Sequence, residues 1–121
     1  MTNRQQKGKR SEDVAARFLE KRGLKVVGQN VRCVLGEIDL ICMDGKTIVF
    51  VEVKSRFGAG YGLPQESITP AKQRKLTRLA QWYLNQHRLE NQPARFDVVA
   101  VNWKGEEPEL TWIANAFEAR E

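Results

Sequence analysis

The amino-acid sequence predicts an α/β fold in which a mixed β-sheet is flanked by helices. A first helical pattern is followed by runs of β-branched and aliphatic residues, which are typical of strands. Asp44-Gly45, between two of these runs, is a hairpin-turn signal. A second helical stripe after Thr69-Pro70 precedes another strong strand, so the chain returns to the sheet by a helical crossover. We therefore expect a single domain over residues 1–121, with the element order α-β-β-β-α-β-β.

Each expected element has a local signal. Residues 1–10 are polar and basic, which predicts a flexible basic arm. Ser11 is expected to cap the first helix and Gly23 to end it. Thr69 and Pro70 supply the cap and first residue of the second helix, whose apolar stripe fades near His87. The expected strands span 24–32, 37–43, 47–54, 96–103 and 110–113, with a helical tail after the last.

Composition narrows the class of protein. The chain has 20 basic and 15 acidic residues, a net charge of +5, with 41% hydrophobic and 29% charged residues, as in globular domains. No apolar run approaches the roughly 20 residues that cross a bilayer, and no apolar segment follows the basic start as in a secretory signal. Cys33 and Cys42 are too few for a disulfide scaffold and lack metal-site spacing. We expect a cytoplasmic protein whose charge suits a polyanionic partner.

Charged residues interrupt the apolar strands of the expected hairpin. With a two-residue turn at Asp44-Gly45, Glu37 faces Glu52, and alternation places Asp39 and Lys54 on the same face. Asp39 and Glu52 are then diagonal neighbours, with Cβ atoms roughly 6–8 Å apart. A divalent ion between them would remove their repulsion, and oxygen ligands suit Mg²⁺ or Mn²⁺. Lys54 could stabilise negative charge developing at a phosphate. The alternative from spacing alone is an ion-pair cluster on a solvated sheet face.

Two helix positions point toward this face. Glu12 lies at the edge of the buried stripe of the first helix, although the helix dipole also favours a Glu there. Gln73 faces inward near the start of the second helix. Four cations crowd the same helix start, and none has an acidic residue four positions away. They are Lys72, Arg74, Lys75 and Arg78. They predict a phosphate-facing strip, with a merely solubilising face as the alternative.

Several sequence blocks together resemble a known family. Glu12 on a first helix, followed in order by GEIDLI, VFVEVKSR, TPAKQRKL and RFDVVAV, resembles the YraN-like family of small bacterial proteins. The resemblance runs from about Lys7 to Phe117. That family is similar to the archaeal Holliday-junction resolvases and shares the restriction-endonuclease-like fold. The resemblance thus implies an αβββαβ core that carries a metal-dependent nuclease site on its central hairpin.

The resemblance also implies roles for individual residues. Asp39 and Glu52 match the paired metal-binding acids, and Lys54 matches the catalytic lysine. The metal ligands would be Asp39, Glu52, the backbone carbonyl of Val53 and Glu12 through water, with Gln73 and Glu37 as accessory residues. The implied activity is a Mg²⁺- or Mn²⁺-dependent endonuclease that acts on DNA rather than RNA, with branched or damaged DNA as candidate substrates. A homodimer is a further expectation. The alternative is a non-catalytic nucleic-acid-binding or scaffold protein that retains the fold.

Overall fold

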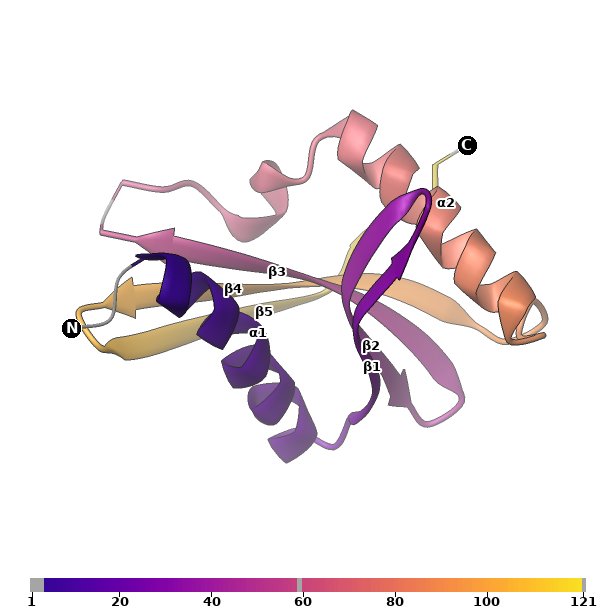
Figure 1. Ribbon diagram of the computed structural model, residues 1–121, viewed down its shortest axis with the longest axis horizontal. Coiled ribbons are helices and arrows are strands. Elements are labelled where there is room, and N and C mark those ends of the chain that lie inside the picture. Colours follow the sequence, from indigo (N-terminus) through magenta and orange to yellow (C-terminus); the bar gives the residue numbers. More distant parts are fainter. Residues whose placement is uncertain (1–3, 59, 121) are drawn as a thin grey trace.

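A computed structural model describes residues 4–58 and 60–120, which form a five-stranded sheet with one long helix on each face (Figure 1). The elements are α1 Arg4–Lys21, β1 Lys25–Cys33, β2 Gly36–Asp44, β3 Thr47–Phe57, a short 3-10 helix η1 Pro64–Ser67, α2 Pro70–Gln86, β4 Ala94–Lys104 and β5 Glu107–Phe117. The predicted fold class and element order are confirmed. No helix in these ranges combines the length and apolarity needed to cross a bilayer.

The strands lie in the order in which they occur in the chain. β3 and β4 are parallel, and the three other neighbouring pairs are antiparallel. α2 is the crossover that joins the two parallel strands, as expected from its place between two strong strand signals. The sheet is therefore mixed, with its parallel pair next to the hairpin that carries the acidic residues.

Each helix covers one sheet face with its own apolar core. On one face, α1 places Ala15 and Leu19 against alternate strand residues such as Leu40, Val51 and Val99. The core on the other face, under α2, contains Leu79, Tyr83, Ile41, Phe50 and Phe96. Because both faces of the central strands are covered, these strands are nearly continuous apolar runs. A charged side chain within them must therefore lie where the helices leave an opening.

The first helix begins earlier than expected. α1 starts at Arg4, so residues 4–10 are helical rather than a flexible arm, while residues 1–3 lie outside the described residues. Ser11 is a buried residue within the helix rather than its cap. Its hydroxyl donates to the carbonyl of Lys7 (2.8 Å) and accepts from Nε1 of Trp103 (2.9 Å). The contact with Trp103 is a tertiary one, which a local capping signal cannot reveal. Gly23, at φ +95°, ends the first helix as expected.

The turn between β2 and β3 also differs from the expectation. The turn residues are Gly45-Lys46, so Met43 faces Ile48 rather than Lys46. Gly45, at φ +61°, takes the first central position of the turn, as a type II′ hairpin favours. The predicted pairing was therefore wrong by two residues. Since the shift is even, the side chains stay on their predicted faces.

The C-terminal segment is a longer strand than expected. β5 extends to Phe117 rather than ending near residue 113, and residues 118–120 form no helix. Phe117 stacks on Phe96 with ring centroids 4.7 Å apart, which holds the end of the strand on the sheet. Asn115, at φ +53°, and a register shift opposite it interrupt the strand's alternation. This irregularity explains why the period-2 pattern was short.

Candidate metal site and nucleic-acid surface

The candidate site lies where β2 leaves β3. The ladder between these strands ends at Leu40 and Val51, although β2 continues to Gly36 in its pairing with β1. Figure 1 shows the β1–β2 hairpin turning away from β3 beyond this point. Asp39 is the next residue of β2, and its Oδ2 accepts a hydrogen bond from the backbone N–H of Val53 (2.8 Å). The Asp39 carboxylate therefore occupies the opening between the two strands.

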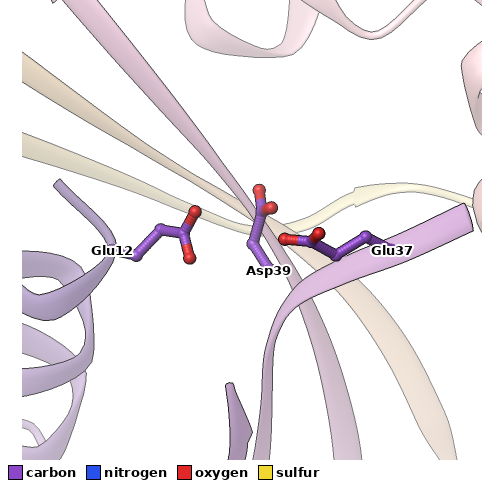
Figure 2. A group of neighbouring side chains, drawn as sticks. All are labelled: Glu12, Glu37 and Asp39. Atoms are coloured by element: carbon purple, nitrogen blue, oxygen red, sulfur yellow. The ribbon is translucent and has the colours of Figure 1, made fainter. Parts of the chain in front are cut away.

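Three carboxylates meet at this opening. Glu37 and Asp39 come from β2, and Glu12 reaches them from α1, with one oxygen of each lying within 4.8 Å of the others. Figure 2 shows Asp39 between the two glutamates, whose carboxylates are turned toward it. Residues from a helix and a strand that are distant in sequence thus converge on one small volume.

The Glu12 carboxylate has a hydrogen-bond partner for only part of its oxygen atoms in this group. Its Oε2 is buried and has no hydrogen-bond partner in the described part of the chain. Burial, followed by the charges of Asp39 and Glu37, raises the pKa of Glu12 from 4.5 to about 6, although a hydrogen bond with Asn30 opposes the shift. A buried carboxylate oxygen without a donor is costly, and a cation would relieve that cost.

Glu52 of β3 joins the group through Asp39. Their two carboxyl groups interact directly, and each affects the pKa of the other. Burial and then the charge of Asp39 raise the pKa of Glu52 from 4.5 to about 7. Burial raises the pKa of Asp39 as well, but the Val53 N–H stabilises its charged form. Ionising both Asp39 and Glu52 at the same time is therefore energetically unfavourable.

Two lysines approach the same pair. Nζ of Lys54, two residues after Glu52, lies 3.7 Å from the Glu52 carboxylate. Lys72, near the start of α2, contacts Lys54, and burial together with this second ammonium lowers the pKa of Lys54. Lys72 is thus part of the site's charge arrangement as well as an exposed cation.

The four predicted cations of α2 divide into two pairs. Lys72 and Lys75 line a hollow of about 140 Å³ whose other lining residues include Glu37 and Glu52. Arg74 and Arg78 are exposed and do not line it. At about 100° per residue, they project from a different side of the helix. The expected single strip is therefore two pairs, of which only one adjoins the carboxylates.

A second hollow lies on the other side of the acidic group. It has a volume of about 500 Å³ and is lined by Lys9 and Asp13 of α1, by Gln29, Asn30 and Arg32 of β1, and by Glu12 and Glu37. Glu37 lines both hollows, so they meet at the carboxylates. The β1–β2 hairpin thus stands between two concave surfaces.

Gln73 does not join this group. Its side chain donates to the carbonyl of Ile68 (3.0 Å) and accepts from Nε of Arg120 (2.5 Å). Its hydrogen bonds among the described residues thus tie α2 to the chain before it and to the C-terminal segment. Asn30, which sequence reasoning missed, contacts Glu12 instead and has φ +53°. Asn tolerates that conformation, so the residue type alone indicated a turn or bulge rather than a site.

The acidic group fits a hard divalent cation. Arg32 pairs with Glu37 (2.6 Å) and Lys54 with Glu52, whereas Glu12 and Asp39 have no ion-pair partner in ranges 4–58 and 60–120. The buried, unpartnered oxygen of Glu12 adds to this uncompensated negative charge. Carboxylate oxygens are the ligands that Mg²⁺ and Mn²⁺ prefer. The cluster of Glu12, Glu37 and Asp39 could therefore hold a metal ion.

Fold and site together define an α/β protein with a carboxylate cluster between diverging strands, and comparison with known proteins gives its family. The model described as "Uncharacterised protein family UPF0102" matches residues 11–101. A UPF0102 protein of Syntrophus aciditrophicus is 48% identical over 118 residues, covering 98% of this chain and 93% of its own. One of Desulfosudis oleivorans is also 48% identical, over 119 residues, covering 98% and 95%. The chain belongs to the UPF0102 family, and the expected family membership is confirmed.

A solved structure also shows similarity. The structure titled as Pyrococcus furiosus SfsA in complex with Ca²⁺ is 11% identical to this chain, with a TM-score of 0.45. The similarity covers 88% of this chain and 63% of that one.

Proposed function

We propose that this protein is a Mg²⁺- or Mn²⁺-dependent endonuclease that hydrolyses phosphodiester bonds in DNA. The observation that carries the proposal is the convergence of Glu12 from α1 and Asp39 from β2, with an oxygen of Glu12 buried and unpartnered. An ion-pair cluster on a solvated face would not leave such an oxygen buried. Its location beside two hollows that also contain lysines supports an anionic substrate.

Asp39, Glu52 and Glu12 would hold the metal, with Glu37 as an accessory carboxylate. Val53 would contribute its backbone carbonyl. In an extended strand the N–H and C=O of one residue point to the same side, and the N–H of Val53 points to Asp39. Such an ion supplies Lewis acidity to a phosphoryl oxygen and lowers the pKa of a water. Its charge also makes the ionised forms of Asp39 and Glu52 compatible, so Glu52 would release its proton when the ion binds.

Lys54 would stabilise the phosphate as negative charge develops on it. Its ammonium group is already held beside Glu52 and only partly exposed, so it need not be reoriented during the reaction. Lys72 raises the local positive potential next to it. Lys72 and Lys75 would hold the phosphate backbone on the α2 side of the site, and Arg74 and Arg78 would contact phosphates farther from it.

The test is cleavage of a panel of linear and branched DNA substrates with Mn²⁺ or Mg²⁺. We expect wild type and Glu90→Gln, a control at an exposed carboxylate, to cleave at the same rate. Asp39→Asn should abolish cleavage. Equal cleavage by wild type and Asp39→Asn would contradict the proposal. Metal binding without cleavage of any substrate would favour the non-catalytic nucleic-acid-binding protein instead.

A further inference from the structure

The tip of the β1–β2 hairpin exposes two adjacent apolar side chains. β1 ends at Cys33 and β2 begins at Gly36, so Val34 and Leu35 form a two-residue turn. Val34 is fully exposed, and Leu35 is 43% exposed. Neither belongs to the apolar cores on the two sheet faces. The tip therefore presents apolar surface that the fold does not use.

Turn chemistry does not explain these two residues. Neither Val34 nor Leu35 has a positive φ, so the turn accepts most residue types and does not require apolar ones. The turn between β2 and β3 differs, because Gly45 there has φ +61°, a conformation that favours glycine. Two adjacent exposed apolar residues that neither the turn geometry nor the packing of the cores requires point to function.

The tip is held against α2. Gly36 has φ +140°, and a Cβ built there would lie 2.9 Å from Cε of Lys75 and 3.6 Å from Cδ1 of Leu79. The absence of a side chain at Gly36 thus lets the hairpin approach the helix closely. The N–H of Leu35 also donates to Sγ of Cys33 (3.4 Å), which closes the turn. The apolar tip is therefore fixed in position relative to the lysines of α2.

Basic side chains flank the apolar tip, although one of them, Arg32, pairs with Glu37 (2.6 Å). Lys75 lies against the base of the tip, and Arg32 on β1 extends into solvent with 79% of its side chain exposed. A partner that suits this surface has anionic groups around an apolar surface. Stacked nucleobases bordered by phosphates have this character, and apolar side chains on DNA-binding proteins enter between base steps in this way.

We propose that Val34 and Leu35 form a wedge that enters the base stack of DNA where stacking is already interrupted, as at a bulge or nick. This inference rests on the proposed function, which it deepens by naming the substrate feature that the protein recognises. Separating two stacked bases is costly, and the cost is least where stacking is already lost. The wedge would thus direct the protein to interrupted duplexes in preference to continuous ones.

The hairpin also relates the wedge to the carboxylates. Leu35 precedes Asp39 by four residues along the hairpin, a distance of ~13 Å at the rise of a strand. Because one DNA strand rises about 3.4 Å per nucleotide, this distance corresponds to about four nucleotides. Cleavage should therefore occur about four nucleotides from the interrupted step.

The test measures binding without divalent ions, so that it does not depend on cleavage. The probe is a DNA duplex with 2-aminopurine beside a one-nucleotide bulge, compared with the continuous duplex. We expect wild type to bind the bulged duplex about tenfold more tightly and to raise its fluorescence, because an unstacked 2-aminopurine is brighter. Val34→Asn with Leu35→Gly should lose this preference and the fluorescence change. Asn and Gly are both common in turns, and the change removes no contact of either apolar core, so the variant should fold. Val27→Asn, at another exposed valine of β1, is the matched control.

Retention of the preference by the tip variant would overturn the wedge and leave the proposed nuclease intact. Loss of the preference with unchanged cleavage of continuous duplex would support the wedge. If the tip variant alters sedimentation or vesicle binding but not DNA binding, the tip contacts another copy or a membrane, and the proposal is wrong. The nuclease proposal itself is tested separately, by comparing wild type with Asp39→Asn in the cleavage assay.

Discussion

The backbone N–H of Val53 donates a 2.8 Å hydrogen bond to Oδ2 of Asp39, so a carboxylate takes the place of a strand carbonyl where β2 leaves β3. This bond fixes the orientation of Asp39 before any ion arrives. It also links the two halves of the candidate metal site, because Val53 immediately follows Glu52. A substitution at Asp39 should therefore separate structural from chemical effects if it keeps the acceptor oxygen.

Asp39→Asn should retain the fold and lose the metal. The amide keeps an oxygen that accepts from Val53 but removes the negative charge that a divalent ion requires. We expect affinity for Mn²⁺, measured by isothermal titration calorimetry, to fall by at least about tenfold, with a thermal midpoint close to wild type. Unchanged Mn²⁺ affinity would show that the ion, if bound, lies elsewhere.

Lys54→Ala should remove cleavage and retain metal binding. Its charge is proposed to act on the developing phosphate charge, so the rate should fall by about 10²–10³-fold. Affinity for Mn²⁺ should remain within a few-fold of wild type, because ammonium groups are not metal ligands. Lys46→Ala, at the exposed β2–β3 turn, is the matched control. If wild type and Lys54→Ala show the same residual cleavage, a contaminating nuclease accounts for the signal.

The two cation pairs of α2 should differ in their effect on DNA. Lys72→Glu with Lys75→Glu changes the charge by the same amount as Arg74→Glu with Arg78→Glu. Only the first pair lines the hollow beside the carboxylates. We expect both double variants to lower affinity and to reduce the slope of log affinity against log salt by up to about two. Only the lysine variant should also move or abolish the cut site. Identical cleavage patterns for the two double variants would contradict the proposal that Lys72 and Lys75 position the DNA at the site.

Stability without divalent ions should decrease as pH rises. The pKa values of Glu12 and Glu52 are raised from 4.5 to about 6 and about 7. The folded protein therefore binds these protons more tightly than the unfolded chain does. The resulting stabilisation is complete below pH 4.5 and is lost as pH rises through about 6 and 7. Urea unfolding across this range should show the decrease.

Two further measurements test the origin of this pH dependence. Glu52→Gln should show a shallower decrease than wild type, because it removes one of the two titrating groups. Added Mg²⁺ should restore stability at the upper end of the range, because it binds the folded form. A decrease of equal slope in Glu52→Gln and wild type would mean that Glu52 does not titrate in this range.

The sequence predicted the elements well because their signals are local. Thr69 caps α2 by accepting from the N–H of Lys72 (3.2 Å), and Gly23 ends the first helix, as their residue types indicated. The start of α1 was missed because Ser11 is held by Trp103, which is far away in sequence. A buried Ser that contacts a distant strand gives the same one-letter signal as a helix cap.

The sequence placed the site residues of β2 and β3 on one face because side chains alternate along a strand, and this placement does not require the exact pairing between the strands. Asp39 and Glu52 were expected to be diagonal neighbours, and the observed turn brings their carboxyl groups into contact although the predicted pairing was wrong. The opening between β2 and β3 was not predicted, because the end of a ladder leaves no pattern in the residues that follow it. Lys72 was identified as a cation, but its contact with Lys54 depends on how α2 packs on the sheet.

The parallel pairing of β3 with β4 has a consequence for folding order. Ile48 pairs with Ala94 and Phe57 with Trp103, so the central ladder forms only after the chain has closed a long loop through α2. The meander of β1, β2 and β3 needs only short turns. Loop-closure entropy makes such distant pairing slow. We therefore expect Asp39 and Glu52 to come together early, in a local unit, before the central ladder completes the sheet.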